Sequence, residues 1–74
     1  MTIRPGDTVT TKERWGFLTL FEEPNMLSDN VVDLAWTQPV LVIGVSGSWL
    51  AVMVPRKEGG VWFAWRETEH FKLA

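Results

Sequence analysis

Residues 39–65 read PVLVIGVSGSWLAVMVPRKEGGVWFAW, and this stretch decides the fold. Three apolar runs, at 40–45, 49–54 and 61–65, are separated by two short segments that contain glycine. Branched and aromatic residues favour strands, and glycine between such runs favours tight turns. The stretch therefore predicts a three-stranded antiparallel meander with turns at 46–48 and 56–60.

The three runs differ in how they are expected to face the core. Val40–Val45 is almost wholly apolar, which predicts a central strand covered on both faces, and Gly44 is a candidate β-bulge. In the second run Leu50, Val52 and Val54 alternate and are expected to form the core. Trp49, Ala51 and Met53 then lie on the opposite face.

Shorter elements are expected on either side of the meander. The β-prone runs at 7–11 and 15–21 predict strands, 66–70 has room for one helical turn, and 71–73 predicts a closing strand. Residues 31–36 are ambiguous, because Ser28 or Asp29 would cap a short helix while the alternation equally fits a strand. We favour the strand, since it follows a β-prone run across a loop.

Composition restricts the classes of protein to consider. The chain has 74 residues, 46% of them hydrophobic, no cysteine and a formal net charge of −2. This predicts one domain over residues 1–74, without disulfides, and no attraction to nucleic acid or membranes through bulk charge. The first residues lack the apolar core of a signal peptide, so we expect a cytoplasmic protein.

The two ends of the chain resemble a known architecture. The opening Arg4–Val9, the run Gly60–Trp65, the helical turn after it and the final Phe71–Leu73 are similar to small Src-homology-3-type (SH3-like) barrels. The resemblance implies an all-β barrel of five to six antiparallel strands. It also implies a long loop after the first strand and a single 3₁₀ turn before the last. Many small bacterial and bacteriophage proteins resemble this architecture. The chain has no tyrosine, so it departs from the signalling members that bind polyproline.

Catalytic groups are sparse, and we expect no enzyme, no cofactor and no metal site. His70 is the only histidine and lies in a glutamate-rich turn. Ser46 and Ser48 lie in an expected hairpin turn without the strand–elbow–helix context of a nucleophile. Glu22 and Glu23 are neighbours in sequence, so on a strand they would point to opposite faces.

Tryptophan is the unusual feature of this composition. Five tryptophans, at 15, 36, 49, 62 and 65, exceed what so small a core is expected to enclose. One interpretation is that they cover the barrel ends. The other is an exposed aromatic patch that binds a partner protein or a second copy of the chain. The residues expected in that patch are Trp49, Met53 and Trp62, joined by Phe17 or Phe21.

Two alternative functions remain open. The first is nucleic-acid binding through Arg56 and Lys57 at a hairpin tip, with a base stacked on Trp62. The same residues also fit an ordinary solvated loop, in which Glu58 partly neutralises the positive charge of the tip. The second alternative is a small phage accessory or inhibitor protein, which only the small size of the chain supports.

Overall fold

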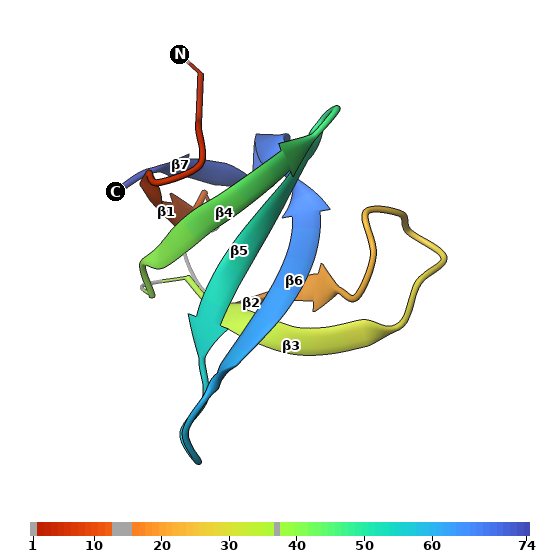
Figure 1. The fold of residues 1–74 in the computed structure, drawn as a ribbon, viewed down its shortest axis with the longest axis vertical. Coiled ribbons are helices and arrows are strands. Elements are labelled where there is room, and N and C mark those ends of the chain that lie inside the picture. The colour runs from red at the N-terminus through yellow and green to blue at the C-terminus, as the bar shows by residue number, and fades with distance from the viewer. Residues whose placement is uncertain (1, 13–15, 37) are drawn as a thin grey trace.

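A computed structural model describes residues 2–12, 16–36 and 38–74 of the chain. It holds seven strands and one 3₁₀ turn (Figure 1). The elements are β1 (Thr8–Thr11), β2 (Phe17–Phe21), β3 (Asn30–Ala35), β4 (Val40–Ser46), β5 (Trp49–Pro55), β6 (Val61–Glu67), η1 (Thr68–His70) and β7 (Phe71–Leu73). The all-β class is confirmed, but the expected count of five to six strands is too low. Trp15 lies outside the described residues.

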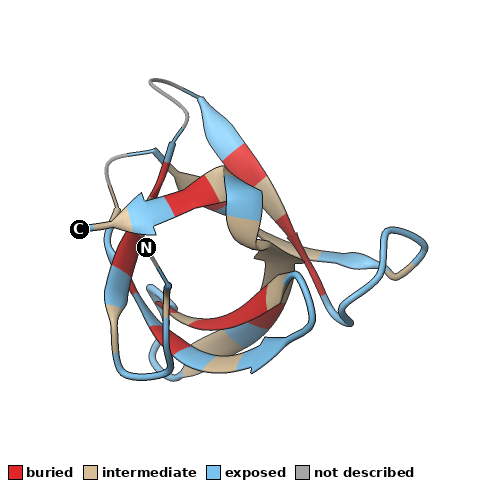
Figure 2. Cartoon of the chain, turned by 90° about the horizontal axis from the view of Figure 1, so that it is seen from above, coloured by how far each residue is buried: buried red, intermediate tan, exposed pale blue. Residues whose placement is uncertain are grey.

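The strands form one antiparallel sheet in the order β3-β2-β6-β5-β4-β1-β7. The sheet curls into a half-barrel, and buried residues alternate with more exposed ones along its strands (Figure 2). The predicted meander is confirmed as β4, β5 and β6, which occupy the middle of the sheet. The chain between the first strand and the meander holds the hairpin β2–β3, so it is more ordered than the long loop that the resemblance implied.

Residues 30–35 form a strand and not a helix. β3 pairs with β2 in register, with Leu34 opposite Leu18, and both side chains are buried. Val32, opposite Leu20, packs against the same core. Pairing with β2 therefore decides a segment whose own periodicity was indecisive.

The core lies on the concave side of the sheet. Its fully buried side chains come from strands that are distant in sequence, including Val9, Leu20, Val42 and Phe71. The prediction that Leu50, Val52 and Val54 face the core is confirmed, since each is at most 3% exposed. Ala64 on β6 is also fully buried and pairs with Val52.

The outer side of β4 differs from the prediction. A strand covered on both faces was expected, yet Leu41 and Ile43 are 37% and 40% exposed. The described chain forms a single sheet, so no second layer packs on its convex side. The expected bulge at Gly44 is confirmed, because the register between β4 and β5 shifts between Val42 and Gly44.

The connections follow the turn chemistry of the sequence. Gly47 joins β4 to β5 with φ 58°, and Gly60 precedes β6 with φ 79°, a region that L residues with side chains rarely adopt. The predicted helical turn is η1, which comes directly before β7. No helix in the described ranges is long and apolar enough to cross a membrane.

Candidate functional site

The candidate site is the convex side of the meander, which we call the outer face. Its members are the outward-pointing residues Leu41, Ile43, Gly44, Trp49, Ala51, Met53, Phe63 and Trp65. Residues directly opposite on antiparallel strands share a face of the sheet. The strand register therefore sorts most of these residues into three rows across β4, β5 and β6.

The first row is the most exposed. Met53 lies opposite Leu41 on one side and Phe63 on the other. Leu41 is 37% exposed and Phe63 is 59% exposed, while Met53 between them is half-buried. Thr8 on β1 extends the row beyond Leu41. Three neighbouring strands thus present adjacent apolar side chains to solvent without a charged residue in the row.

The second row is flatter and better covered. Ala51 lies opposite Gly44 and Trp65, and Trp65 in turn lies opposite Phe21 on β2. A Cβ on Gly44 would lie 3.7 Å from the Cβ of Ala51, so two small residues leave a shallow centre. Trp65 is half-buried. The row therefore connects the exposed first row to the end of the sheet that holds Trp49.

Trp49 forms the third row with Ser46 and Glu67. Its ring meets the ring of Phe21 edge to face, with 6.1 Å between the ring centroids. Beside Trp49 lies a hollow of about 600 Å³. Its lining combines apolar, hydroxyl and acidic side chains and consists of Met26, Ser48, Trp49, Glu67, Thr68 and Glu69.

Arg66 supports this end of the site from beneath. Its Nη1 donates a hydrogen bond to the carbonyl of Thr19 at 3.1 Å, and its Nε lies 3.2 Å from Oε1 of Glu67. The guanidinium carbon lies 5.1 Å from the ring centroid of Phe21. The arginine therefore links β6 to β2 and holds the ring against which Trp49 packs.

One cluster has metal-ligand chemistry but is already occupied by a protein cation. Donor atoms of Glu67, Glu69 and His70 lie within 4.8 Å of one another. The Arg66 guanidinium contacts Glu67 at 3.2 Å and its Nη2 lies 3.3 Å from Nε2 of His70. A divalent cation at this position would meet that positive charge, so the cluster fits an ion-pair network better than a metal centre.

The structure separates the five residues expected in the patch. Trp49 and Met53 point to the outer face, as the alternation predicted. Phe21 is only 7% exposed, because Trp49 and Arg66 cover it. Phe17 is 71% exposed but lies on β2, opposite Ala35 of β3 and away from the rows described above.

Trp62 differs most from its expected position. It lies opposite Val54, on the concave side, and packs against the core. The Arg56 guanidinium carbon lies 4.5 Å from the centroid of the Trp62 ring, and Lys57 beside it is exposed. The indole face that the nucleic-acid alternative assigned to a base is therefore in contact with an arginine.

Phe63, Leu41 and Ile43 are members of the site that sequence reasoning missed. Phe63 lies in the run 61–65, in which both sets of alternating residues are apolar, so alternation does not show which set faces outward. The signal that would have found it is the small residue Ala64, which fits the inside of a tight barrel and so directs Phe63 outward. Comparison with protein-family models, with curated proteins and with solved structures found no match to this chain.

Proposed function

We propose that this chain is a non-enzymatic protein-binding module and that its outer face is the contact surface. The observation that carries the proposal is the row of Leu41, Met53 and Phe63. A ring that is 59% exposed beside two further apolar side chains costs free energy in water unless a partner covers it. Aromatic and methionine side chains are enriched in protein interfaces, whereas most charged side chains are depleted there.

The proposal includes the architecture. The order of elements supports a small barrel of Src-homology-3 type, because a three-stranded meander is followed by a 3₁₀ turn and a short last strand. The final strand β7 pairs with the first strand β1, so the two ends of the chain are joined in one sheet. Because such barrels serve many functions, the proposal rests on the outer face and not on the architecture.

The test compares Phe63→Ser with the matched control Phe17→Ser. Both rings are exposed, but only Phe63 belongs to the outer face. Proteins retained from host lysate by the wild type are purified, and each is titrated with the wild type and with both variants. We expect Phe63→Ser to weaken affinity at least tenfold, about the effect of losing an interface hot spot. Equal affinities of the two variants would refute the proposal.

The same variants distinguish a different partner from a second copy of the chain. Sedimentation equilibrium of the wild type alone reports self-association. A dimer that Phe63→Ser dissociates and Phe17→Ser retains would identify the second copy as the occupant of the outer face. A monomer at all concentrations would leave a different protein as the partner.

The nucleic-acid alternative has its own observation and test. Arg56 and Lys57 project from the β5–β6 turn, and Arg56 is stacked on Trp62. Binding through this tip predicts that Lys57→Ala weakens retention of single-stranded DNA in a low-salt gel shift, and that affinity falls with salt. A gel without retarded DNA at low salt would dismiss this alternative.

A further inference from the structure

The free edge of β7 is a second feature with no assigned partner in the described structure. β7 is the last strand of the sheet, and β1 is its one strand neighbour. The N–H of Ala74 donates to the carbonyl of Thr8 at 2.9 Å, and the N–H of Lys12 donates to the carbonyl of His70 at 2.8 Å. These two bonds fix which residues of β7 bond to β1.

Alternate residues of β7 point their main-chain N–H and carbonyl groups away from β1. In an antiparallel ladder, hydrogen-bonded pairs alternate with pairs that are not bonded to each other. Leu73 lies opposite Val9 and Phe71 lies opposite Thr11, which are the non-bonded positions. The N–H and carbonyl of Leu73 and the carbonyl of Phe71 therefore point to the free edge, where another strand would pair.

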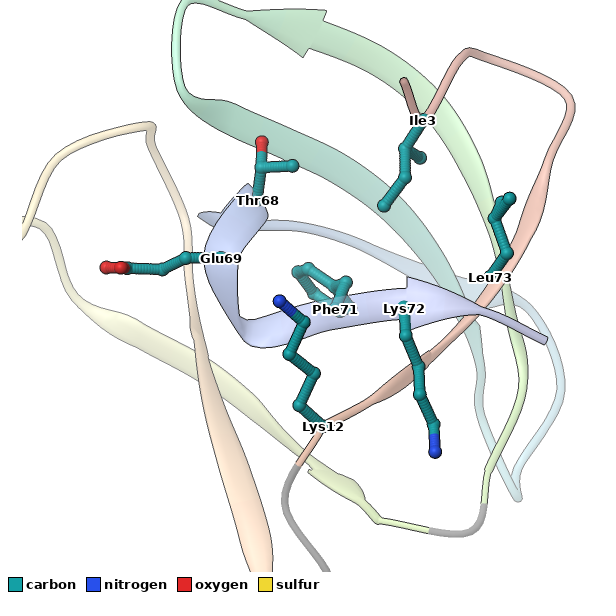
Figure 3. Close-up of a pocket in the computed structure, with 7 residues that line it drawn as sticks. All are labelled: Ile3, Lys12, Thr68, Glu69, Phe71, Lys72 and Leu73. Carbon is teal, nitrogen blue, oxygen red and sulfur yellow. The ribbon is translucent and has the colours of Figure 1, made fainter. Parts of the chain in front are cut away.

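A hollow lies beside this edge (Figure 3). Its volume is about 260 Å³, below the roughly 300–1,000 Å³ typical of small-molecule sites, so its size suits one side chain. Phe71, itself 2% exposed, forms the base, with Ile3 and Leu73 as apolar walls. The full lining is Ile3, Lys12, Thr68, Glu69, Phe71, Lys72 and Leu73.

Two lysines give this edge a positive character on both faces. The Lys12 side chain runs past Phe71 towards η1, whereas Lys72 points to the opposite side of β7 (Figure 3). Neither ammonium group has an ion pair with a carboxylate of the described residues. Glu69 also lines the hollow, but its carboxylate extends away from Phe71.

We propose that the β7 edge binds an extended segment of another protein in which apolar and acidic side chains alternate. The segment adds a strand by pairing with the main chain of Leu73, and it places one apolar side chain in the hollow over Phe71. Because alternate residues of a strand share a face, its acidic side chains all lie on the face of Lys72, opposite the hollow. A second copy of β7 fits poorly, since it would bring two copies of Lys72 close together.

The probe is a fluorescein-labelled peptide with blocked ends and the sequence Thr-Glu-Val-Glu-Val-Glu-Thr. One matched control replaces each glutamate by lysine, and another carries N-methyl groups on the edge that would pair. Fluorescence anisotropy is expected to show saturable binding of the acidic peptide and at least tenfold weaker binding of both controls, about the loss for reversed charge or blocked pairing. Amide ¹⁵N shifts are expected to centre on Leu73.

Variants of the chain complete the test. Lys72→Glu, at an exposed position, and the double variant with Lys12→Glu are expected to weaken binding of the acidic peptide about tenfold. Lys57→Glu, at another exposed lysine, and Phe63→Ser are expected to leave it unchanged. The proposal is overturned if the peptide does not bind saturably, if the lysine variants bind it equally well, or if the shifts centre on the outer face. Absence of saturable binding, or equal binding by the lysine variants, leaves the outer-face proposal untouched, whereas shifts centred on the outer face would favour it.

Discussion

At the scale of single residues, the direction in which a side chain leaves its strand decides its contribution. Leu20 on β2 points to the concave side and is fully buried, whereas Phe63 on β6 points outward and is 59% exposed. Both are large and apolar, so composition alone does not distinguish them. The packed interior penalises a cavity at Leu20, and solvent fills the space that a smaller residue leaves at Phe63.

This difference predicts opposite outcomes for two substitutions. Leu20→Ala is expected to lower the free energy of unfolding by about 2–5 kcal/mol, because it removes fully buried methyl groups and leaves a cavity. Phe63→Ser is expected to lower it by less than about 1 kcal/mol, the span of strand preferences at exposed sites. Urea unfolding followed by circular dichroism measures both. A larger loss for Phe63→Ser than for Leu20→Ala would contradict the assignment of the outer face.

The tryptophans show how far the sequence alone leads. Alternation required Trp62 and Trp65 to differ in direction, and they do, with Trp62 over the core and Trp65 on the outer face. Alternation did not show which of the two tryptophans faces inward, because both sets of alternating residues in 61–65 are apolar. Trp49 and Met53 were predictable, since Leu50, Val52 and Val54 form an unambiguous inward set.

At the scale of elements, Arg66 joins parts of the chain that are distant in sequence. Its guanidinium bonds to the carbonyl of Thr19 on β2, pairs with Glu67 at the end of β6 and lies over Phe21. The arginine side chain is 15% exposed. The link therefore acts in a partly desolvated setting, where charge-assisted hydrogen bonds are stronger.

Removing this link is expected to loosen the hairpin from the meander. Arg66→Ala should lower the free energy of unfolding by about 1.5–3 kcal/mol, the range for hydrogen bonds that involve a charged group. The control Arg56→Ala removes an arginine whose side chain is 38% exposed and should cost less than about 1 kcal/mol. Guanidinium-chloride unfolding measures both. Equal losses would show that Arg66 does not join the elements as described.

The turns give a second prediction at this scale. Gly60 has φ 79°, and a Cβ added there would meet nothing within 4 Å, so Gly60→Ala tests backbone strain alone and should cost about 1–2 kcal/mol. Gly44→Ala meets the Cβ of Ala51 at 3.7 Å, an ordinary contact, and should change stability by less than about 0.5 kcal/mol. Thermal unfolding of both variants checks the order, and a reversed order would contradict the conformation given for the β5–β6 turn.

The elements also mark where sequence reasoning succeeds. The meander was predictable because glycine turns separate three apolar runs. The strand expected at 31–36 is confirmed as β3, although a six-residue segment fits either period and the preference came from its neighbours, with pairing to β2 deciding it. The exposed side of β4 was missed because a nearly continuous apolar run usually indicates two covered faces. Here the single curled sheet leaves one of those faces open.

At the scale of the whole molecule, the concave side of the curled sheet is filled by core side chains, whereas its convex side is exposed. The core occupies the concave side, while the convex side of the meander presents Leu41, Met53 and Phe63. The β7 edge lies three strands further along the sheet from β5. The molecule thus has two separate surfaces that differ in chemistry, one apolar and flat, the other an open strand edge between two lysines.

The most direct test of the outer face is site-specific photo-crosslinking. A benzoylphenylalanine introduced at Phe63 is compared with one at Leu27, which is 97% exposed in the β2–β3 loop but outside the three rows. The lysate is illuminated, and adducts are identified by denaturing gel and mass spectrometry. We expect one defined adduct from position 63, and we expect that adduct to be absent from position 27. The account is contradicted if position 63 gives no adduct, or if both positions capture the same protein equally.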